Sequence, residues 1–333
     1  MITPAFGLTA TERVLPKLAL DFTTAVLDAR VTVTRTTNAT NPATYINSSG
    51  VITAATNNQP RFDYDPATLL CRGLLIEESR ANSLLNTDLL ATQIVTVTAA
   101  VRTLSFYGTG SVTLSGAHVA VVSGTGAYPT RTTYSFTPSA GALTLTVAGT
   151  VQFAQLELGA FATSYIPTTT TSLTRNADAV SMTGTNFSSW YNATEGTFVL
   201  EYFETGINKT AAGLIANAGA YTDVIGMYID GSIGVPIQPN FVVLNSNSIQ
   251  ANILDAAPPA NSVAKMVAAY KQNSFAFALN GLLAGTDASG TIPTVNQLQI
   301  GNELNGIFAN RHFAKVSYFP QRLTNAEVQA FSK

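Results

Sequence analysis

Regular alternation of apolar and hydroxyl-bearing residues in the middle of the chain constrains its fold more than any other feature. In the stretch GALTLTVAG, Leu143, Leu145 and Val147 take every second position. Tyr134 and Phe136 alternate in the same way in RTTYSFT. Successive side chains of a β-strand point to opposite faces, so this pattern predicts strands with one buried and one exposed face. Clusters of glycine and proline such as SGTGAYP separate these strands, which indicates an antiparallel sandwich or small barrel.

The composition extends this prediction to the whole chain. Of its 333 residues, 46% are hydrophobic and only 11% are charged. Thr, Ser and Asn supply much of the polarity, a mixture that favours strands over helices. The chain is too long for one hydrophobic core, so we expect several domains. Charge density predicts three parts: a charged segment at 1–90, a nearly uncharged sandwich with its linker at 91–176, and a mixed segment at 177–333.

The last part of the chain predicts longer strands and one short helix. Asn280 and Gly281 stand between two apolar runs, and this dipeptide predicts a β-hairpin because both residues tolerate positive φ. Near the carboxyl end, Thr324 and Glu327 have the spacing of a helix-capping box ahead of Val328. The predicted fold class is therefore all-β.

Several function classes do not fit this composition. The net charge is −2, and the sequence has no run of Lys or Arg that could bind the phosphate backbone of a nucleic acid. We therefore expect no nucleic-acid partner. The single cysteine, Cys71, excludes an internal disulfide and a multi-cysteine metal site, and we interpret it as a buried, inert thiol. Charged residues and prolines interrupt the apolar runs, so we expect neither membrane insertion nor a signal peptide.

Charged residues concentrate in the stretch PRFDYDPATLLCRGLLIEESRANSLL, residues 60–85. Its GLLIEE segment places three consecutive apolar residues before two carboxylates, which indicates a strand buried on both sides. Charges held near a core must be paired, and the neighbouring arginines can pair with them. We therefore predict structural ion pairs in preference to a catalytic pair, formed by Arg61, Asp63, Asp65, Arg72, Glu77, Glu78 and Arg80.

Several stretches resemble parts of tailed-bacteriophage virion proteins. The runs AAYKQNSFAFALNG, TIPTVNQLQIGNELNG and HFAKVSYFPQRLTNAEVQAFS are similar to the carboxyl half of concanavalin A-like (laminin-G-like) jelly rolls. The charged stretch at 60–85 and its surroundings resemble the module that precedes such domains in tail-fibre and virion-decoration proteins. QLELGAFATSYIPTTTTSLTRNAD is similar to the linker that follows their small carbohydrate-binding-module-like sandwich.

This resemblance implies a structural virion protein of the tail-fibre, head-spike or decoration type. Residues 1–90 would form an attachment and oligomerisation module, residues 91–176 the small sandwich, and residues 177–333 an outward-facing jelly roll. The implied partners are other capsid or tail proteins and a host-surface polysaccharide. The implied location is the virion surface, after synthesis in the bacterial cytoplasm. A homo-oligomer, trimeric by analogy, is expected because repetition strengthens weak sugar sites.

Catalytic patterns are weak in this sequence. Glycoside hydrolysis normally requires two carboxylates facing each other across the substrate. In EGTFVLEYFE, Glu201 and Glu204 differ in parity, so a regular strand places them on opposite faces. His118 and His312 have no accompanying Gly-x-Ser-x-Gly elbow. We therefore expect no enzymatic activity; a polysaccharide depolymerase and a purely structural decoration protein without ligand are the alternatives.

Saccharide binding is the chemistry that the sequence favours, because sugar sites combine an aromatic wall with short polar groups. The only tryptophan, Trp190, lies in the polar, turn-forming context NFSSWYNATEG. It could equally plug the edge of the sandwich, and the sequence leaves both interpretations open. Tyr128 and Arg131 form a weaker pair by the same logic. The predicted carbohydrate-binding residues are Trp190, Tyr191, Tyr221 and Asp223.

No cofactor is expected. Asp223, Asp230 and Asp287 are alternative calcium ligands, as the resemblance to laminin-G-like domains implies for some members. The chain has no dense Asp/Asn loop of the EF-hand type, so we interpret each of the three as a solvated loop carboxylate.

Overall fold

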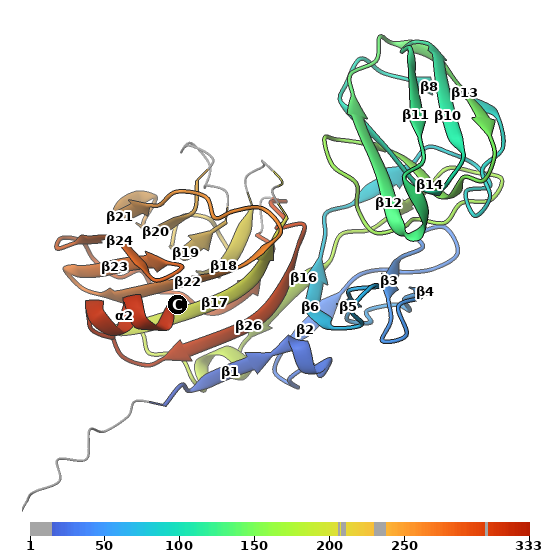
Figure 1. Ribbon diagram of the computed structural model, residues 1–333. Coiled ribbons are helices and arrows are strands. Elements are labelled where there is room, and N and C mark those ends of the chain that lie inside the picture. The colour runs from blue at the N-terminus through green and yellow to red at the C-terminus, as the bar shows by residue number, and fades with distance from the viewer. Residues whose placement is uncertain (1–14, 206, 208–210, 230–237, 304–305) are drawn as a thin grey trace, which may run out of the picture.

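The computed structural model describes residues 15–333 apart from 206, 208–210, 230–237 and 304–305. Antiparallel strands dominate the described residues, which confirms the predicted all-β class. Figure 1 shows a small sandwich standing beside a larger body, with β3 (Thr44–Ile46), β4 (Ile52–Ala54) and β5 (Phe62–Tyr64) near the junction. Among the described residues, no helix has the length and hydrophobicity needed to cross a membrane.

The larger body is a jelly-roll sandwich built from two antiparallel sheets. In the first sheet the strand order is β24 (Leu282–Asp287), β23 (Ser274–Leu279), β22 (Ser262–Lys271), β17 (Glu195–Glu204), β26 (Arg311–Phe319), β6 (Cys71–Ile76) and β5, with β1 (Leu18–Asp21) also paired to β26. In the second sheet the order is β2 (Thr32–Thr34), β16 (Ala179–Thr183), β25 (Gln297–Ile300), β18 (Ala212–Asn217), β19 (Val224–Tyr228), β20 (Asn240–Asn245) and β21 (Ser248–Leu254).

Alternation along these strands places the main core between the two sheets. On β17, Phe198, Leu200 and Tyr202 point inward and pack in one cluster with side chains of the opposite sheet such as Leu214 and Ile225. A second, smaller cluster lies under the terminal helix α2 (Asn325–Phe331), which covers the outer side of the first sheet.

Both local signals predicted in the last part of the chain are confirmed. Asn280 and Gly281 adopt positive φ values of 48° and 83° between β23 and β24, whose residues Leu279 and Leu282 pair. Thr324 caps α2, and both hydrogen bonds of the capping box with Glu327 are present.

Strands within the predicted module 1–90 pair with strands of the larger body. Strand β6 pairs with β26, where Leu75 lies opposite His312, and β2 pairs with β16. A short 3₁₀ turn, η1 (Phe22–Thr24), connects β1 to the following segment, and β7 (Arg80–Asn82) pairs with β15 (Leu173–Arg175). The apolar character of GLLIEE accounts for this placement: Leu74 and Ile76 pack in the main core of the jelly roll, and Leu75, on the other face of β6, is buried outside that core.

The small sandwich has its own hydrophobic core. Its four-stranded sheet has the order β11 (Ala120–Ser123), β10 (Ser111–Gly116), β13 (Gly141–Ala148) and β8 (Gln93–Val97), and its three-stranded sheet has the order β12 (Gly126–Phe136), β9 (Arg102–Gly108) and β14 (Gln152–Leu158). Leu143 and Leu145 are fully buried in this core, and Val147 packs against it, as the alternation predicts.

Candidate functional site

A cluster of buried charges lies where the amino-terminal segment meets the linker between the two sandwiches. Arg61 is fully buried, and its Nη1 lies 2.7 Å from Glu77 Oε2. Its Nη2 pairs with Asp178, and the other oxygen of Asp178 lies 2.5 Å from Nη1 of Arg35. These four residues come from distant parts of the chain, so the ion pairs hold the segments around β2, β5, β6 and β16 together.

The linker between the sandwiches completes this cluster. Arg175 Nη1 lies 3.2 Å from Glu77 Oε2, and the backbone N–H and hydroxyl of Ser164 donate to Glu77 at 2.7 and 2.6 Å. Burial alone would raise the pKa of Glu77, but the charges of Arg175 and Arg61 and the Ser164 hydrogen bonds hold that pKa well below its usual range. Glu157 differs, because burial raises its pKa and the opposing interactions, Arg131 first among them, do not outweigh it.

The predicted ion-pair residues separate into the buried cluster, a half-exposed pair (Arg72–Asp65) and a largely buried pair (Arg80–Glu78). Arg72 Nη2 lies 2.6 Å from Asp65 Oδ2 in a half-exposed pair, and Arg80 Nε lies 2.6 Å from Glu78 Oε1. Asp63 contacts a histidine, His312, at 2.9 Å from Oδ2 to Nε2. The partners Arg35, Arg175 and Asp178 were not predicted, because no local pattern indicates that residue 178 lies beside residue 61.

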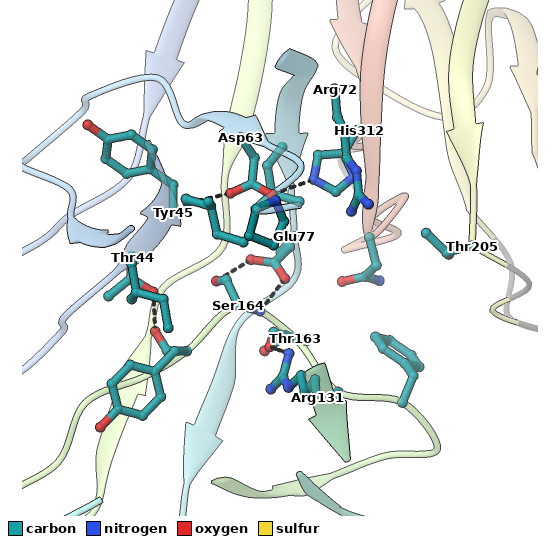
Figure 2. Close-up of a pocket in the computed structure, with 18 of the residues that line it drawn as sticks. Thr44, Tyr45, Asp63, Arg72, Glu77, Arg131, Thr163, Ser164, Thr205 and His312 are labelled. Atoms are coloured by element: carbon teal, nitrogen blue, oxygen red, sulfur yellow. Dashed lines mark hydrogen bonds and ion pairs between the residues drawn. The ribbon is translucent and has the colours of Figure 1, made fainter. Parts of the chain in front are cut away.

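A cleft of about 510 Å³ lies directly beside this cluster. It is lined by residues of the amino-terminal segment, the small sandwich, the linker and β26, including Tyr45, Asp63, Arg72, Tyr107, Arg131, Phe161, Ser164 and His312. Figure 2 shows Asp63, His312 and Arg72 gathered at one end of the pocket, and Arg131 and Thr163 at the other. Residues far apart in the sequence thus form one concave surface.

Hydrogen bonds hold the polar groups at both ends of the cleft in place. Asp63 Oδ1 accepts from the backbone N–H of Ile46 at 2.6 Å, while its Oδ2 contacts His312 Nε2. An ionised carboxylate only accepts, so that nitrogen donates. The other ring nitrogen, Nδ1, is buried and has no partner among the described residues. Arg131 donates from Nη1 to the Thr163 carbonyl and from Nη2 to Ser105 Oγ, both at 2.8 Å.

Tyr107 is one of the aromatic residues that line the same cleft. Tyr107 lies 5.1 Å from the ring of Tyr128 and 5.9 Å from the guanidinium carbon of Arg131. The Tyr128 hydroxyl donates to the carbonyl of Gly50, and burial raises the pKa of Tyr128 to about 12. Tyr128 and Arg131 were the weaker of the predicted sugar-binding pairs. Arg131 lines the cleft, and Tyr128 contacts the cleft residue Tyr107 without being part of the lining itself.

Trp190 does not form an exposed platform, which corrects the predicted sugar-binding role. Its side chain is in the core, with 4% of the residue exposed, and its ring centroid lies 4.9 Å from that of Phe187 and 5.0 Å from that of Tyr318. The indole N–H donates to the Asn186 carbonyl at 2.7 Å. The short helix α1 (Thr185–Ser188) turns the chain so that Trp190 and the partly buried Tyr191 fill the end of the sandwich.

The other predicted pair lies elsewhere. Tyr221 packs against a cluster that includes Ile215 and Val224, separate from the cluster that contains Trp190. The Asp223 carboxylate accepts from the Ser246 backbone N–H at 3.0 Å and from the Thr222 hydroxyl at 2.9 Å. The four predicted carbohydrate-binding residues therefore do not form a single site.

The candidate calcium ligands are dispersed as well. Asp287 accepts hydrogen bonds from the backbone N–H and the hydroxyl of Ser289, and Asp223 accepts those from Ser246 and Thr222. Asp230 lies outside the residues that the structure describes. Within the described ranges, no three His, Cys, Asp or Glu side chains gather in a group that could hold a metal ion.

The thiol of Cys71 is half-buried, and burial raises its pKa.

The carboxylates of β17 are each matched to a cation. Glu201 lies 3.4 Å from Lys265 Nζ, and Glu195 lies 3.5 Å from Lys271 Nζ. Glu204 is buried on the inward side of the strand and lies 2.9 Å from Arg311 Nη2. Glu201 and Glu204 point to opposite faces, as their parity predicts.

No protein-family model matches the sequence, and no curated protein matches it either. Several solved structures share a β-sandwich with part of the chain. The CBM40 of Ruminococcus gnavus IT-sialidase bound to α2,3-sialyllactose has 15% identity, covers 44% of this chain and 88% of its own, and gives a TM-score of 0.36. Domain 4 of the Geobacillus stearothermophilus arabinanase AbnA in complex with arabinotriose has 10% identity, covers 47% of this chain and 73% of its own, and gives a TM-score of 0.37. A heptameric SAP-like pentraxin from Limulus polyphemus has 15% identity, covers 42% of this chain and 70% of its own, and gives a TM-score of 0.32. At these values the likeness carries no functional information.

Proposed function

We propose that this protein binds a saccharide, without cleaving it, in the cleft between the two sandwiches. The observation that carries the proposal is the composition of the cleft: three aromatic residues, Tyr45, Tyr107 and Phe161, line it beside a few polar groups held in place. Saccharides present apolar ring faces and a fringe of hydroxyls, and such ligands bind where an apolar wall meets a few placed polar groups. The volume of about 510 Å³ suits a ligand of a few sugar residues.

The buried ion cluster supports this proposal by holding the cleft open. Glu77 and Ser164 belong both to the cluster and to the cleft lining. The polar groups need no reordering when a ligand arrives, because part-buried hydrogen bonds already fix Arg131 and Asp63. Binding to a preorganised site avoids the entropic cost of ordering it.

Cleavage of a glycosidic bond requires a carboxylic acid that can give up a proton and a second carboxylate facing it. Of the two carboxylates in the cleft, Glu77 has a strongly lowered pKa and is engaged by two arginines and Ser164. Asp63 is engaged by Ile46 and His312. Both are committed to structural contacts, which favours binding over hydrolysis; release of new reducing ends from a bound polysaccharide would contradict this and support the depolymerase alternative.

Substituting Ala162→Trp is expected to abolish or strongly weaken saccharide retention. Ala162 lines the cleft from the linker, so an indole there fills the space that the ligand needs. We expect affinity to fall about 10-fold or more, which is about 1.4 kcal/mol. The measurement is retention of the purified protein on an array of bacterial surface polysaccharides, followed by titration with the retained glycan.

The matched control is Ala257→Trp, in the exposed loop between β21 and β22 and outside the cleft lining. Equal binding by both variants would place the sugar site elsewhere. Retention of no glycan by the unsubstituted protein would remove the proposal altogether and favour a purely structural role.

The saccharide that we propose is a host cell-surface polysaccharide, and the protein is displayed on the surface of a tailed-phage particle. The resemblance of residues 60–85, 155–178 and 180–333 to phage virion proteins supports this placement. In this arrangement the other partners are capsid or tail proteins and further copies of the same chain. Homo-oligomerisation strengthens weak saccharide binding through effective concentration.

Antibodies against residues 180–333 are expected to decorate the outside of intact phage particles in negative-stain images. The position of the label on head or tail identifies the attachment site. Absence of label from particles that contain the chain by immunoblot would contradict surface display.

A further inference from the structure

We infer that the ligand is an acidic saccharide, and that Arg131 binds its carboxylate. This inference rests on the proposed saccharide binding in the cleft and adds the chemical class of the ligand. Its basis is the difference between Arg131 and the other arginines around the cleft.

Those other arginines are paired with carboxylates. Arg61 and Arg175 are paired with Glu77, Arg35 with Asp178, and Arg72 with Asp65. In the part of the chain that the structure describes, Arg131 has no carboxylate within ion-pairing distance. Glu157 acts on it only through space, since the hydrogen bonds of that carboxylate go to Thr163 and Gln155. One guanidinium at the cleft thus lacks a direct counter-ion.

The contacts of Arg131 also leave its fork available. Nη1 and Nη2 each donate one hydrogen bond to the protein, to the Thr163 carbonyl and to Ser105 Oγ. Each of these nitrogens carries a second N–H. A planar guanidinium held in this way matches the two oxygens of a carboxylate, and charge-assisted pairs of this kind are among the strongest hydrogen bonds.

The opposite end of the cleft sets the orientation of the ligand. Figure 2 shows Asp63 and His312 at the end away from Arg131. The Asp63 carboxylate would repel an acidic group, but it can accept hydrogen bonds from hydroxyl groups of the ligand. The carboxylate of the sugar therefore binds at Arg131, and hydroxyl groups of the ligand lie at Asp63.

The test uses an array of bacterial surface polysaccharides, each printed in its native form and in a carboxyl-reduced form, in which the carboxylate becomes a primary alcohol. We expect the full-length protein to retain uronate- or other carboxylate-bearing glycans and to bind their reduced forms about 10-fold or more weakly. Retention of neutral glycans only, or equal binding of native and reduced forms, overturns the acidic-ligand inference and leaves saccharide binding intact. Retention of no glycan overturns the proposed function itself.

Variants of Arg131 test whether this residue causes the preference for the native over the carboxyl-reduced glycan. Arg131→Gln is expected to weaken binding of the native acidic glycan about 10-fold or more and to remove most of the preference for the native over the reduced form, whereas Arg131→Lys retains part of that preference because it keeps the charge without the fork. Lys271→Gln, which removes an exposed cation far along the first sheet, is the charge control. Thermal unfolding verifies that each variant is folded. An unchanged preference in folded Arg131→Gln assigns the carboxylate to another residue and overturns the role of Arg131.

Discussion

Replacing Arg61 by leucine is expected to lower the free energy of unfolding by about 3 to 5 kcal/mol. The side chain is fully buried and is paired with both Glu77 and Asp178. Removing it leaves the carboxylates of Glu77 and Asp178 buried with one cation fewer. The loss of stability is large because a buried carboxylate without its cation is strongly destabilising, even where replacing the whole ion pair by apolar residues would cost little. Urea denaturation followed by far-UV circular dichroism and by the fluorescence of Trp190 measures the loss.

The matched control is Arg72→Leu, which removes an arginine from the neighbouring pair with Asp65. That pair is exposed to solvent, with 32% and 24% of the two side chains accessible. Exposed ion pairs contribute about 0 to 1 kcal/mol, so we expect a change in this range. Similar losses in both variants would show that the buried cluster has no special role at the junction of the sandwiches.

Acid is expected to destabilise the folded protein through Glu77. The pKa of Glu77 is well below its ordinary value of 4.5 in the folded state. The contribution of this group is therefore fully present above about pH 4.5, where the carboxylate is ionised in both states. As the pH falls below that value, the unfolded chain takes up a proton that the folded protein does not, and the stabilisation is lost until the folded pKa is reached. Urea midpoints measured at pH 7, 5, 4 and 3 should fall steeply only below about pH 4.5.

The variant Glu77→Gln isolates this contribution. It leaves Arg61 and Arg175 with one carboxylate fewer, so we expect lower stability at pH 7. Its stability should then depend less on pH between about 4.5 and 3, because the group that takes up the proton is absent. A pH dependence as steep as that of the unsubstituted protein would show that other carboxylates carry the acid sensitivity.

Local patterns predicted the strands and turns well because their causes are local. The buried Leu143 and Leu145 follow from alternation, and the Asn280–Gly281 hairpin follows from backbone preference. The Arg61–Glu77 pair was likewise within reach of the sequence, since a carboxylate next to an apolar strand needs a cation. Trp190 shows the limit: the residues around it fit a binding platform and a packed position equally well, and only the structure shows that α1 turns the indole into the core.

By itself, the sequence determined the all-β class, the separate core of the small sandwich and the need to pair the charges around GLLIEE. Those properties depend on the period of a strand, on turn residues and on the cost of burying a charge. Only the tertiary structure decided that β6 belongs to the jelly roll, and that Asp63, Arg131 and His312 line one cleft. The reason is that these residues are brought together by strand pairing and ion pairs over more than one hundred positions, and no local pattern encodes such contacts.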